Sequence, residues 1–264
     1  MTRDAGFDAE TFDARMMREG WVLFPSVLAA DAVAALAADC DRVHAICRAV
    51  QERNGVAANM QGAAHHVAGY GGALDEFLAD FPLAGWIDRY FAGKWIVLNY
   101  GAVLNPPGFR AYTAKPHRDV RAFTGGYRLS LNMLVMLSDF TATSGGTLML
   151  SGSHRTEAMP TPEEFAAGAE QIVGRAGDIV LFDSLTVHSA APNRSAAPRR
   201  ALTLCLGRPF MKPQMDWPRY LPESFTATMS EEVRQLMGFN ARVAASLDEY
   251  YQPPERWTFR ADQR

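Results

Sequence analysis

Cysteine is scarce in this chain, and its positions fit neither a disulfide framework nor a paired metal site. The 264 residues include three cysteines, Cys40, Cys47 and Cys205, an odd number without a CxxC pair. Disulfide-rich domains carry more cysteines, and structural zinc or redox sites usually show them in pairs. We therefore expect reduced thiols in a cytoplasmic protein.

Long apolar runs and blocks of like charge are also missing. No stretch reaches the roughly 18 apolar residues of a membrane-spanning helix, and Met1 to Gly6 lack the apolar core of a secretory signal. The 29 acidic and 26 basic residues give a net charge of −3 without a basic block. These absences argue against a membrane or nucleic-acid partner.

No linker or internal repeat divides the chain, so one domain spanning residues 1–264 is expected. Apolar residues recur every three to four positions after Asp31, which predicts a helix to about Val50 with Asp31 as its N-cap. Several short apolar segments are bounded by Gly and Pro and predict strands. They are Trp21–Phe24, Trp95–Leu104, Arg128–Leu137, Ile179–Phe182 and Ala201–Leu206. Such strands after helices favour a mainly β, antiparallel double-sheet barrel with flanking α-helices.

The clearest predicted strand, Arg128–Leu137, has one apolar face and one face that begins with polar side chains. Ser130 and Asn132 lie on this second face, which faces either a wet cavity or solvent. In the first case both residues are candidates for ligand contacts.

Metal-ligand spacing appears at His117-Arg118-Asp119. On an extended backbone, His117 and Asp119 project to the same side. His188, at the end of the segment that follows Ile179–Phe182, is the candidate for a third ligand. Two histidines and one carboxylate suit non-haem Fe(II), with positions left open for substrate and oxygen.

Other side chains have two readings each. The vicinal pair His65-His66 is either a partly exposed loop or part of a loop that contacts substrate. His154 lies in a turn and is more typical of a structural hydrogen-bonding residue than of a ligand. Four basic residues, Arg110, Lys115, Arg118 and Arg121, form either a solvated rim or a site for an anionic substrate.

Two capping-box patterns predict helix starts, at Thr161–Glu164 and at Thr228–Glu231. The second pattern introduces a tail with apolar residues at Val243, Leu247 and Tyr250. This tail could cover the mouth of the barrel or pair with a second subunit, so a homodimer is possible.

Taken together, these motifs resemble the phytanoyl-CoA dioxygenase family of Fe(II)- and 2-oxoglutarate-dependent oxygenases. The resemblance runs from about Phe7 to Phe210 and rests on His117-Arg118-Asp119, on Gly145 to Arg155 and on Gly177 to Asn193 with Pro-Arg-Arg-Ala-Leu downstream. It implies a double-stranded β-helix, that is, a cupin-like jelly roll, over residues of about 95–210. A helical part of about 1–94 and a C-terminal helical tail of about 211–264 would flank this core.

The resemblance also implies the roles of particular residues. His117, Asp119 and His188 would hold iron, and Arg199, eleven residues after His188, would pair with the far carboxylate of 2-oxoglutarate. Asn132 is a further candidate contact to 2-oxoglutarate. Some relatives have a serine two residues after the distal histidine, where this chain has Ala190.

With Fe(II), 2-oxoglutarate and O2, the reaction that the resemblance implies is hydroxylation of an unactivated C–H bond of a small-molecule substrate, with release of succinate and CO2. Asp119 favours this outcome, because relatives that chlorinate have a small residue at that position. Desaturation, cyclisation and epimerisation remain alternatives within the same chemistry. A non-catalytic metal-binding barrel is an alternative from another class.

Overall fold

The computed structural model describes residues 6–108 and 112–263, which begin with a helix, a strand and a long second helix. Helix α1 (Ala9–Arg18) is capped by the Asp8 side chain. Strand β1 (Trp21–Phe24) has the predicted bounds. Helix α2 (Ala30–Arg53) confirms the predicted helix, but Asp31 lies in its first turn; the N-cap is Ala29, two residues earlier, and it has no side-chain cap.

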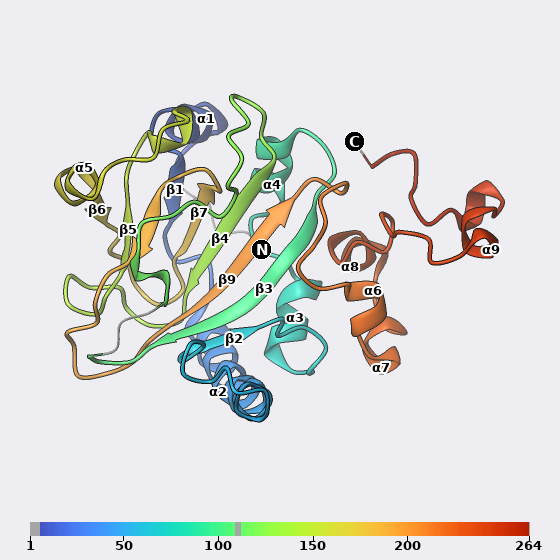
Figure 1. Cartoon of the computed structure of the whole chain (residues 1–264), viewed down its shortest axis with the longest axis horizontal. Helices are drawn as coiled ribbons and strands as arrows, with labels where there is room; N and C mark the ends of the chain where they lie inside the picture. Colours follow the sequence, from blue (N-terminus) through green and yellow to red (C-terminus); the bar gives the residue numbers. More distant parts are fainter. Residues whose placement is uncertain (1–5, 109–111, 264) are drawn as a thin grey trace.

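Six strands form the larger sheet in the order β1-β7-β4-β9-β3-β2, with antiparallel pairing throughout. Figure 1 shows β4, β9 and β3 side by side through its centre. Besides β1, the strands are β2 (Ala63–His65), β3 (Ile96–Asn105), β4 (Ser130–Met136), β7 (Ile179–Asp183) and β9 (Arg199–Gly207). These bounds confirm the strands predicted from the sequence to within about two residues.

Three short strands form a second antiparallel sheet in the order β6-β5-β8. They are β5 (Thr147–Met149), β6 (Glu170–Gln171) and β8 (His188–Ala190). A mainly β core of two antiparallel sheets with flanking helices is therefore confirmed, and it is the jelly-roll architecture that the sequence led us to expect.

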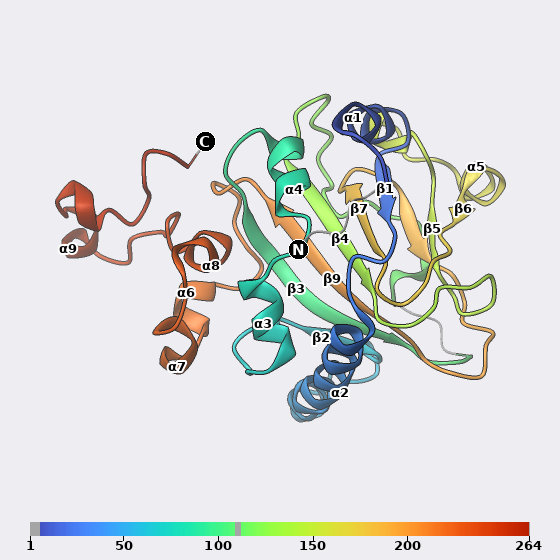
Figure 2. The ribbon, with the colours of Figure 1, turned by 180° about the vertical axis from the view of Figure 1, so that it is seen from behind.

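Alternation along β4 separates the two faces of the larger sheet. Leu131, Met133 and Val135 belong to a core cluster shared with the helices, whereas Leu134 and Met136 belong to a second cluster on the opposite face. The helix-side cluster includes the buried stripe of α2, and Figure 2 shows α2, α3 and α4 on this side of the sheet. The other face is left for the barrel interior.

Shorter helices complete the fold. The predicted capping box at Thr161 is present at the start of α5, whereas the helix predicted from Thr228–Glu231 is capped by Ser230 instead. The α-helices are α3 (Ala73–Ala79), α4 (Ala84–Phe91), α5 (Pro162–Gly168), α6 (Trp217–Tyr220), α7 (Glu223–Thr226), α8 (Glu231–Leu236) and α9 (Leu247–Tyr250). The 3-10 turns are η1 (Tyr112–Ala114), η2 (Ser153–Arg155) and η3 (Pro254–Arg256).

The C-terminal segment lies beside β3 rather than across the barrel. Helix α8 packs near α3 and β3, and the indole of Trp217 donates to the Val97 carbonyl at 2.8 Å. Beyond it, α9 projects away from both sheets in Figures 1 and 2. Val243 is 87% exposed and Leu247 72% exposed, so this part of the tail does not cover the cavity.

All three cysteines are free thiols, as predicted. Within residues 6–108 and 112–263, the structure contains no helix whose length and apolar character would suffice to cross a membrane.

Candidate active site

Two backbone hydrogen bonds place His117 directly opposite His188. Each amide donates to the carbonyl of the other residue at 3.0 Å. Close to this bridge, the amide of Asp119 donates to the Ser184 carbonyl at 3.1 Å. The His-x-Asp segment therefore extends the smaller sheet beside β8, and its alternate side chains point the same way.

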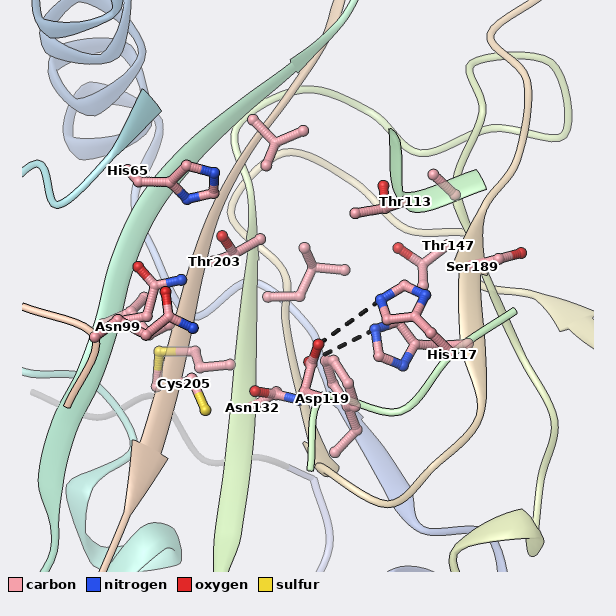
Figure 3. A pocket seen from close by; sticks show the side chains of 18 of the residues that line it. His65, Asn99, Thr113, His117, Asp119, Asn132, Thr147, Ser189, Thr203 and Cys205 are labelled. Carbon is pink, nitrogen blue, oxygen red and sulfur yellow. Dashed lines mark hydrogen bonds and ion pairs between the residues drawn. The ribbon is translucent and has the colours of Figure 1, made fainter. Parts of the chain in front are cut away.

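The three predicted ligand side chains converge. One carboxylate oxygen of Asp119 lies 3.7 Å from Nε2 of His117, and the other lies 3.7 Å from Nε2 of His188 (Figure 3). One donor atom from each residue lies within 4.8 Å of the others, so the group could hold a metal ion. This donor set, two imidazoles and one carboxylate, is the one that non-haem Fe(II) favours.

Hydrogen bonds at the far side of each imidazole orient its ring. Nδ1 of His117 lies 2.8 Å from the Lys115 carbonyl, and Nδ1 of His188 lies 2.9 Å from the Thr186 carbonyl. A carbonyl only accepts, so each Nδ1 carries the proton and each Nε2 presents its lone pair toward Asp119. Burial also lowers the pKa of His188, which favours the neutral ring that a metal requires.

Asn132 supports the carboxylate of this group. Its Nδ2 donates to Oδ2 of Asp119 at 2.7 Å, from a buried position on β4. The sequence suggested Asn132 as a contact to 2-oxoglutarate; the structure places it on the cavity wall, with its amide engaged by Asp119.

Arg199 is a buried cation that forms no ion pair with any part of the chain that the structure describes. Its side chain is 4% exposed, its guanidinium lies 4.6 Å from the ring centroid of Phe140, and burial lowers its pKa to about 10. Nε has no hydrogen-bond partner, and no ion pair within the described residues involves this arginine. An uncompensated buried charge is costly, so the site is built for an anion that comes from outside the chain.

A cavity of about 200 Å³ joins Arg199 to the His-Asp-His group. Its polar lining includes several residues that the sequence did not single out. They are Asn99, Thr113, Thr147, Ser189, Thr203, Cys205 and Gln214. All five predicted site residues also line it, namely His117, Asp119, Asn132, His188 and Arg199.

The vicinal histidines have different environments. His65 ends β2 and lines the cavity, which favours the reading as a substrate-contacting residue. His66 has φ 61° and packs its ring edge-on against Trp217, with centroids 5.5 Å apart. Burial lowers the pKa of both rings, that of His66 to about 4.

Ser130 is used inside the sheet rather than at the cavity. Its hydroxyl donates to the Leu206 carbonyl at 2.7 Å and accepts from Ser184 at 2.9 Å. His154 is buried on η2, and it does not line the cavity, in agreement with a structural role.

The basic residues near the predicted metal ligands do not form one site. Arg118 donates to the carbonyls of Ser153 at 2.8 Å and Thr156 at 2.7 Å, so it anchors the η2 turn. Lys115 and Arg121 are exposed, as a solvated rim requires. Arg110 lies outside the described residues.

The donor set fits Fe(II), and the unpaired Arg199 fits the carboxylate of a keto-acid co-substrate. This combination is expected of the Fe(II)- and 2-oxoglutarate-dependent oxygenases. Comparison with protein-family models agrees, because residues 16–201 match the phytanoyl-CoA dioxygenase family. The chain therefore belongs to this family.

Curated relatives have diverged considerably. The chain is 34% identical over 147 residues to the protein Rv1501 of Mycobacterium tuberculosis, a match that covers 56% of this chain and 54% of that protein. It is 28% identical over 165 residues to the dioxygenase cdmA of Talaromyces verruculosus, covering 58% of this chain and 53% of the relative. The matched region thus spans about half the length of these relatives.

Solved structures share the fold. The 2-oxoglutarate complex of EctD from S. alaskensis has a TM-score of 0.61 at 21% identity and covers 78% of each chain. The α-ketoglutarate-dependent carbocyclase SnoK has a TM-score of 0.60 at 19% identity, covering 78% of this chain and 87% of its own. The epimerase SnoN, in complex with Fe3+ and α-ketoglutarate, has a TM-score of 0.58 at 20% identity, covering 85% and 94%.

Proposed function

We propose that this enzyme hydroxylates an unactivated C–H bond of a small-molecule substrate, with His117, Asp119 and His188 as iron ligands and Arg199 as the anchor of 2-oxoglutarate. The observation that carries the proposal is a buried guanidinium that has no anion partner among the described residues, in the same cavity as a converging His-Asp-His group.

Each residue has a separate task in this proposal. The carbonyls of Lys115 and Thr186 hold both Nδ1 protons, so that both Nε2 lone pairs face the metal position. Asp119 contributes the negative charge of the donor set. When bound together, Fe(II), 2-oxoglutarate and O2 supply an oxidant that takes hydrogen from a C–H bond, while 2-oxoglutarate becomes succinate and CO2.

Arg199 fixes one end of the co-substrate. Its planar group can donate two parallel hydrogen bonds to a carboxylate, and the low exposure of the site strengthens this pairing. The opposite end of 2-oxoglutarate would then lie toward Asp119. A barrel that only binds a metal would have no need of this buried arginine.

Ring formation or epimerisation is the second candidate outcome, because a carbocyclase and an epimerase share this fold. The product distinguishes the two candidates. Hydroxylation adds one oxygen atom, which isotopically labelled O2 would supply, whereas cyclisation and epimerisation leave no labelled atom in the product.

The direct test is succinate release from 2-oxoglutarate, measured together with oxygen uptake, with and without added Fe(II). We expect release that requires Fe(II), stops on chelation and is abolished by His188→Ala. Asp41→Ala is a suitable control, since Asp41 pairs with Arg200 away from the cavity. Full iron-dependent turnover in His188→Ala would rule out the proposed ligand set.

A further inference from the structure

The cavity has a polar wall that neither the metal group nor Arg199 uses. This wall, called the distal wall below, consists of His65, Asn99, Thr203 and Gln214. Figure 3 shows His65, Asn99 and Thr203 on the side of the larger sheet, across the open cavity from His117 and Asp119. A substrate lying between the two sides would contact this wall.

Sheet register aligns the distal wall with the metal group. Asn99 on β3 pairs with Cys205 on β9, which pairs with Asn132 on β4, and Asn132 donates to Asp119. The next row of paired residues on the same face of the sheet contains His65, which pairs with Gly101, and Thr203, which pairs with Gly101 from the other side. Rows on one face of a sheet lie about 7 Å apart, so the wall covers roughly the length of a small organic group.

A β-bulge assembles the part of the wall that contains Gln214. The register shifts between Val97 and Asn99, so Leu98 has no partner residue on β9. The free Leu98 carbonyl accepts the amide of Gln214 at 3.0 Å. This bond brings the segment after β9 back to the cavity beside Asn99, and bulges commonly redirect side chains in this way next to active sites.

Asn99 presents an acceptor that no donor of the described residues reaches. Its Oδ1 is buried and has no hydrogen-bond donor within the described residues. A buried acceptor without a partner costs free energy comparable to a lost hydrogen bond, so such groups require explanation. A ligand that donates a hydrogen bond to Oδ1 would remove this cost.

The distal wall carries no fixed charge. Among the described lining residues, Asp119 and Arg199 are the only carboxylate and guanidinium, and the proposed function assigns both. Burial lowers the pKa of His65, so its ring is neutral near neutral pH. A charged substrate group placed here would be desolvated without a counter-charge.

We propose that the distal wall binds an uncharged hydrogen-bond donor of the primary substrate, an amide N–H or a hydroxyl, and that it rejects carboxylate and ammonium groups. This inference rests on the proposed function, because it takes Asp119 and Arg199 as occupied by iron and 2-oxoglutarate. Asn99 is then the residue that determines specificity for the group.

Four probes with a common ring test this inference: cyclohexanecarboxamide, cyclohexylmethanol, cyclohexanecarboxylate and cyclohexylmethylammonium. Binding is read from the thermal midpoint of the enzyme loaded with Mn(II) and 2-oxoglutarate, where no turnover is needed. We expect the two neutral probes to bind at least about tenfold more tightly than the two charged ones.

Variants at Asn99 make the test specific. Asn99→Leu removes the acceptor and should abolish the advantage of the carboxamide. Asn99→Asp adds a negative charge and should shift the preference toward the ammonium probe by about tenfold or more. Asn59→Asp makes the same charge change at an exposed position outside the cavity and should keep the wild-type order.

Three results would overturn the inference. They are equal binding of neutral and charged probes, no binding of either neutral probe at about 10 mM, or a larger effect of Asn99→Leu on 2-oxoglutarate than on the carboxamide. The last result would assign Asn99 to the co-substrate. Absence of Fe(II)-dependent succinate release would instead count against the proposed function. The order of the four probe affinities would still test the binding preference of the distal wall.

Discussion

Arg199 and Arg200 are neighbours on β9 whose side chains reach opposite environments. Arg199 is buried on the cavity side over Phe140, whereas Arg200 pairs with Asp41 of α2, N to O, at 3.0 Å. Neighbouring side chains on a strand point to opposite faces, so only one of these two arginines can face the cavity. The pair therefore provides a matched comparison for the role of the buried cation.

Replacement of Arg199 by alanine should weaken 2-oxoglutarate by about 2–5 kcal/mol, because a desolvated charge pair would be lost. Arg200→Ala should remove a partly exposed ion pair that is worth at most about 1 kcal/mol and should leave 2-oxoglutarate affinity near the wild-type value. The measurement is the KM for 2-oxoglutarate in succinate release. A larger loss in Arg200→Ala would show that the wrong arginine has been chosen.

Asn132 should act on metal affinity through Asp119. Because its amide donates to Oδ2, Asn132→Leu would leave the carboxylate less well oriented, and Mn(II) affinity should fall about 10- to 100-fold. Ser130→Ala is the control, since Ser130 lies on the same strand face but bonds to Leu206 and Ser184. Unchanged metal affinity together with a raised KM for 2-oxoglutarate would favour the direct co-substrate contact suggested by the sequence.

Local sequence patterns were sufficient to bring together the His-Asp-His group and to predict most strands. Alternation put His117 and Asp119 on one side, and a buried strand with its following turn led to His188. The family spacing supplied Arg199, which lies in the same cavity. These features depend on short-range periodicity or on motifs with a fixed spacing along the sequence.

The residues of the distal wall could not be predicted from the sequence in the same way. Asn99 faces the cavity because a bulge at Leu98 shifts the register, and Gln214 arrives through a hydrogen bond to the freed carbonyl. Both depend on pairing between distant segments. Ser130 illustrates the opposite case. It was a candidate for a ligand contact, but its hydroxyl forms its hydrogen bonds inside the sheet. Sequence periodicity predicts on which face of a strand a side chain lies. Tertiary contacts determine whether that side chain borders a cavity or is packed inside the sheet.

His66 should make stability depend on pH. Its pKa is lowered by burial to about 4 in the folded protein, against about 6.5 for an ordinary histidine. Between these values the unfolded chain binds more protons, so the free energy of unfolding decreases as pH falls from about 7 toward 4. His66→Asn, which tolerates the positive φ, should make this decrease smaller. Urea unfolding at about pH 7.5 and pH 5 measures this decrease in stability. Equal decreases in the wild-type protein and in His66→Asn would contradict the prediction.

Gly20 should be indispensable for the packing behind the metal group. It has φ 85°, and a Cβ there would collide with the ring of His154 and come within 2.6 Å of Oγ1 of Thr186. The Thr186 carbonyl orients His188, so the collision would also disturb a proposed metal ligand. Gly20→Ala should lower the free energy of unfolding by about 2–4 kcal/mol.

A substitution at Gly71 is the comparison that separates the steric collision at Gly20 from the strain of a left-handed backbone. Its φ is 75°, but a Cβ would meet nothing within 4 Å. Gly71→Ala should therefore cost only about 1–2 kcal/mol for the left-handed backbone and should leave Mn(II) affinity unchanged. Urea unfolding of both variants, with Mn(II) titration of each, makes the comparison. Equal losses of stability would mean that backbone conformation alone accounts for Gly20, and that the contacts with His154 and Thr186 contribute nothing.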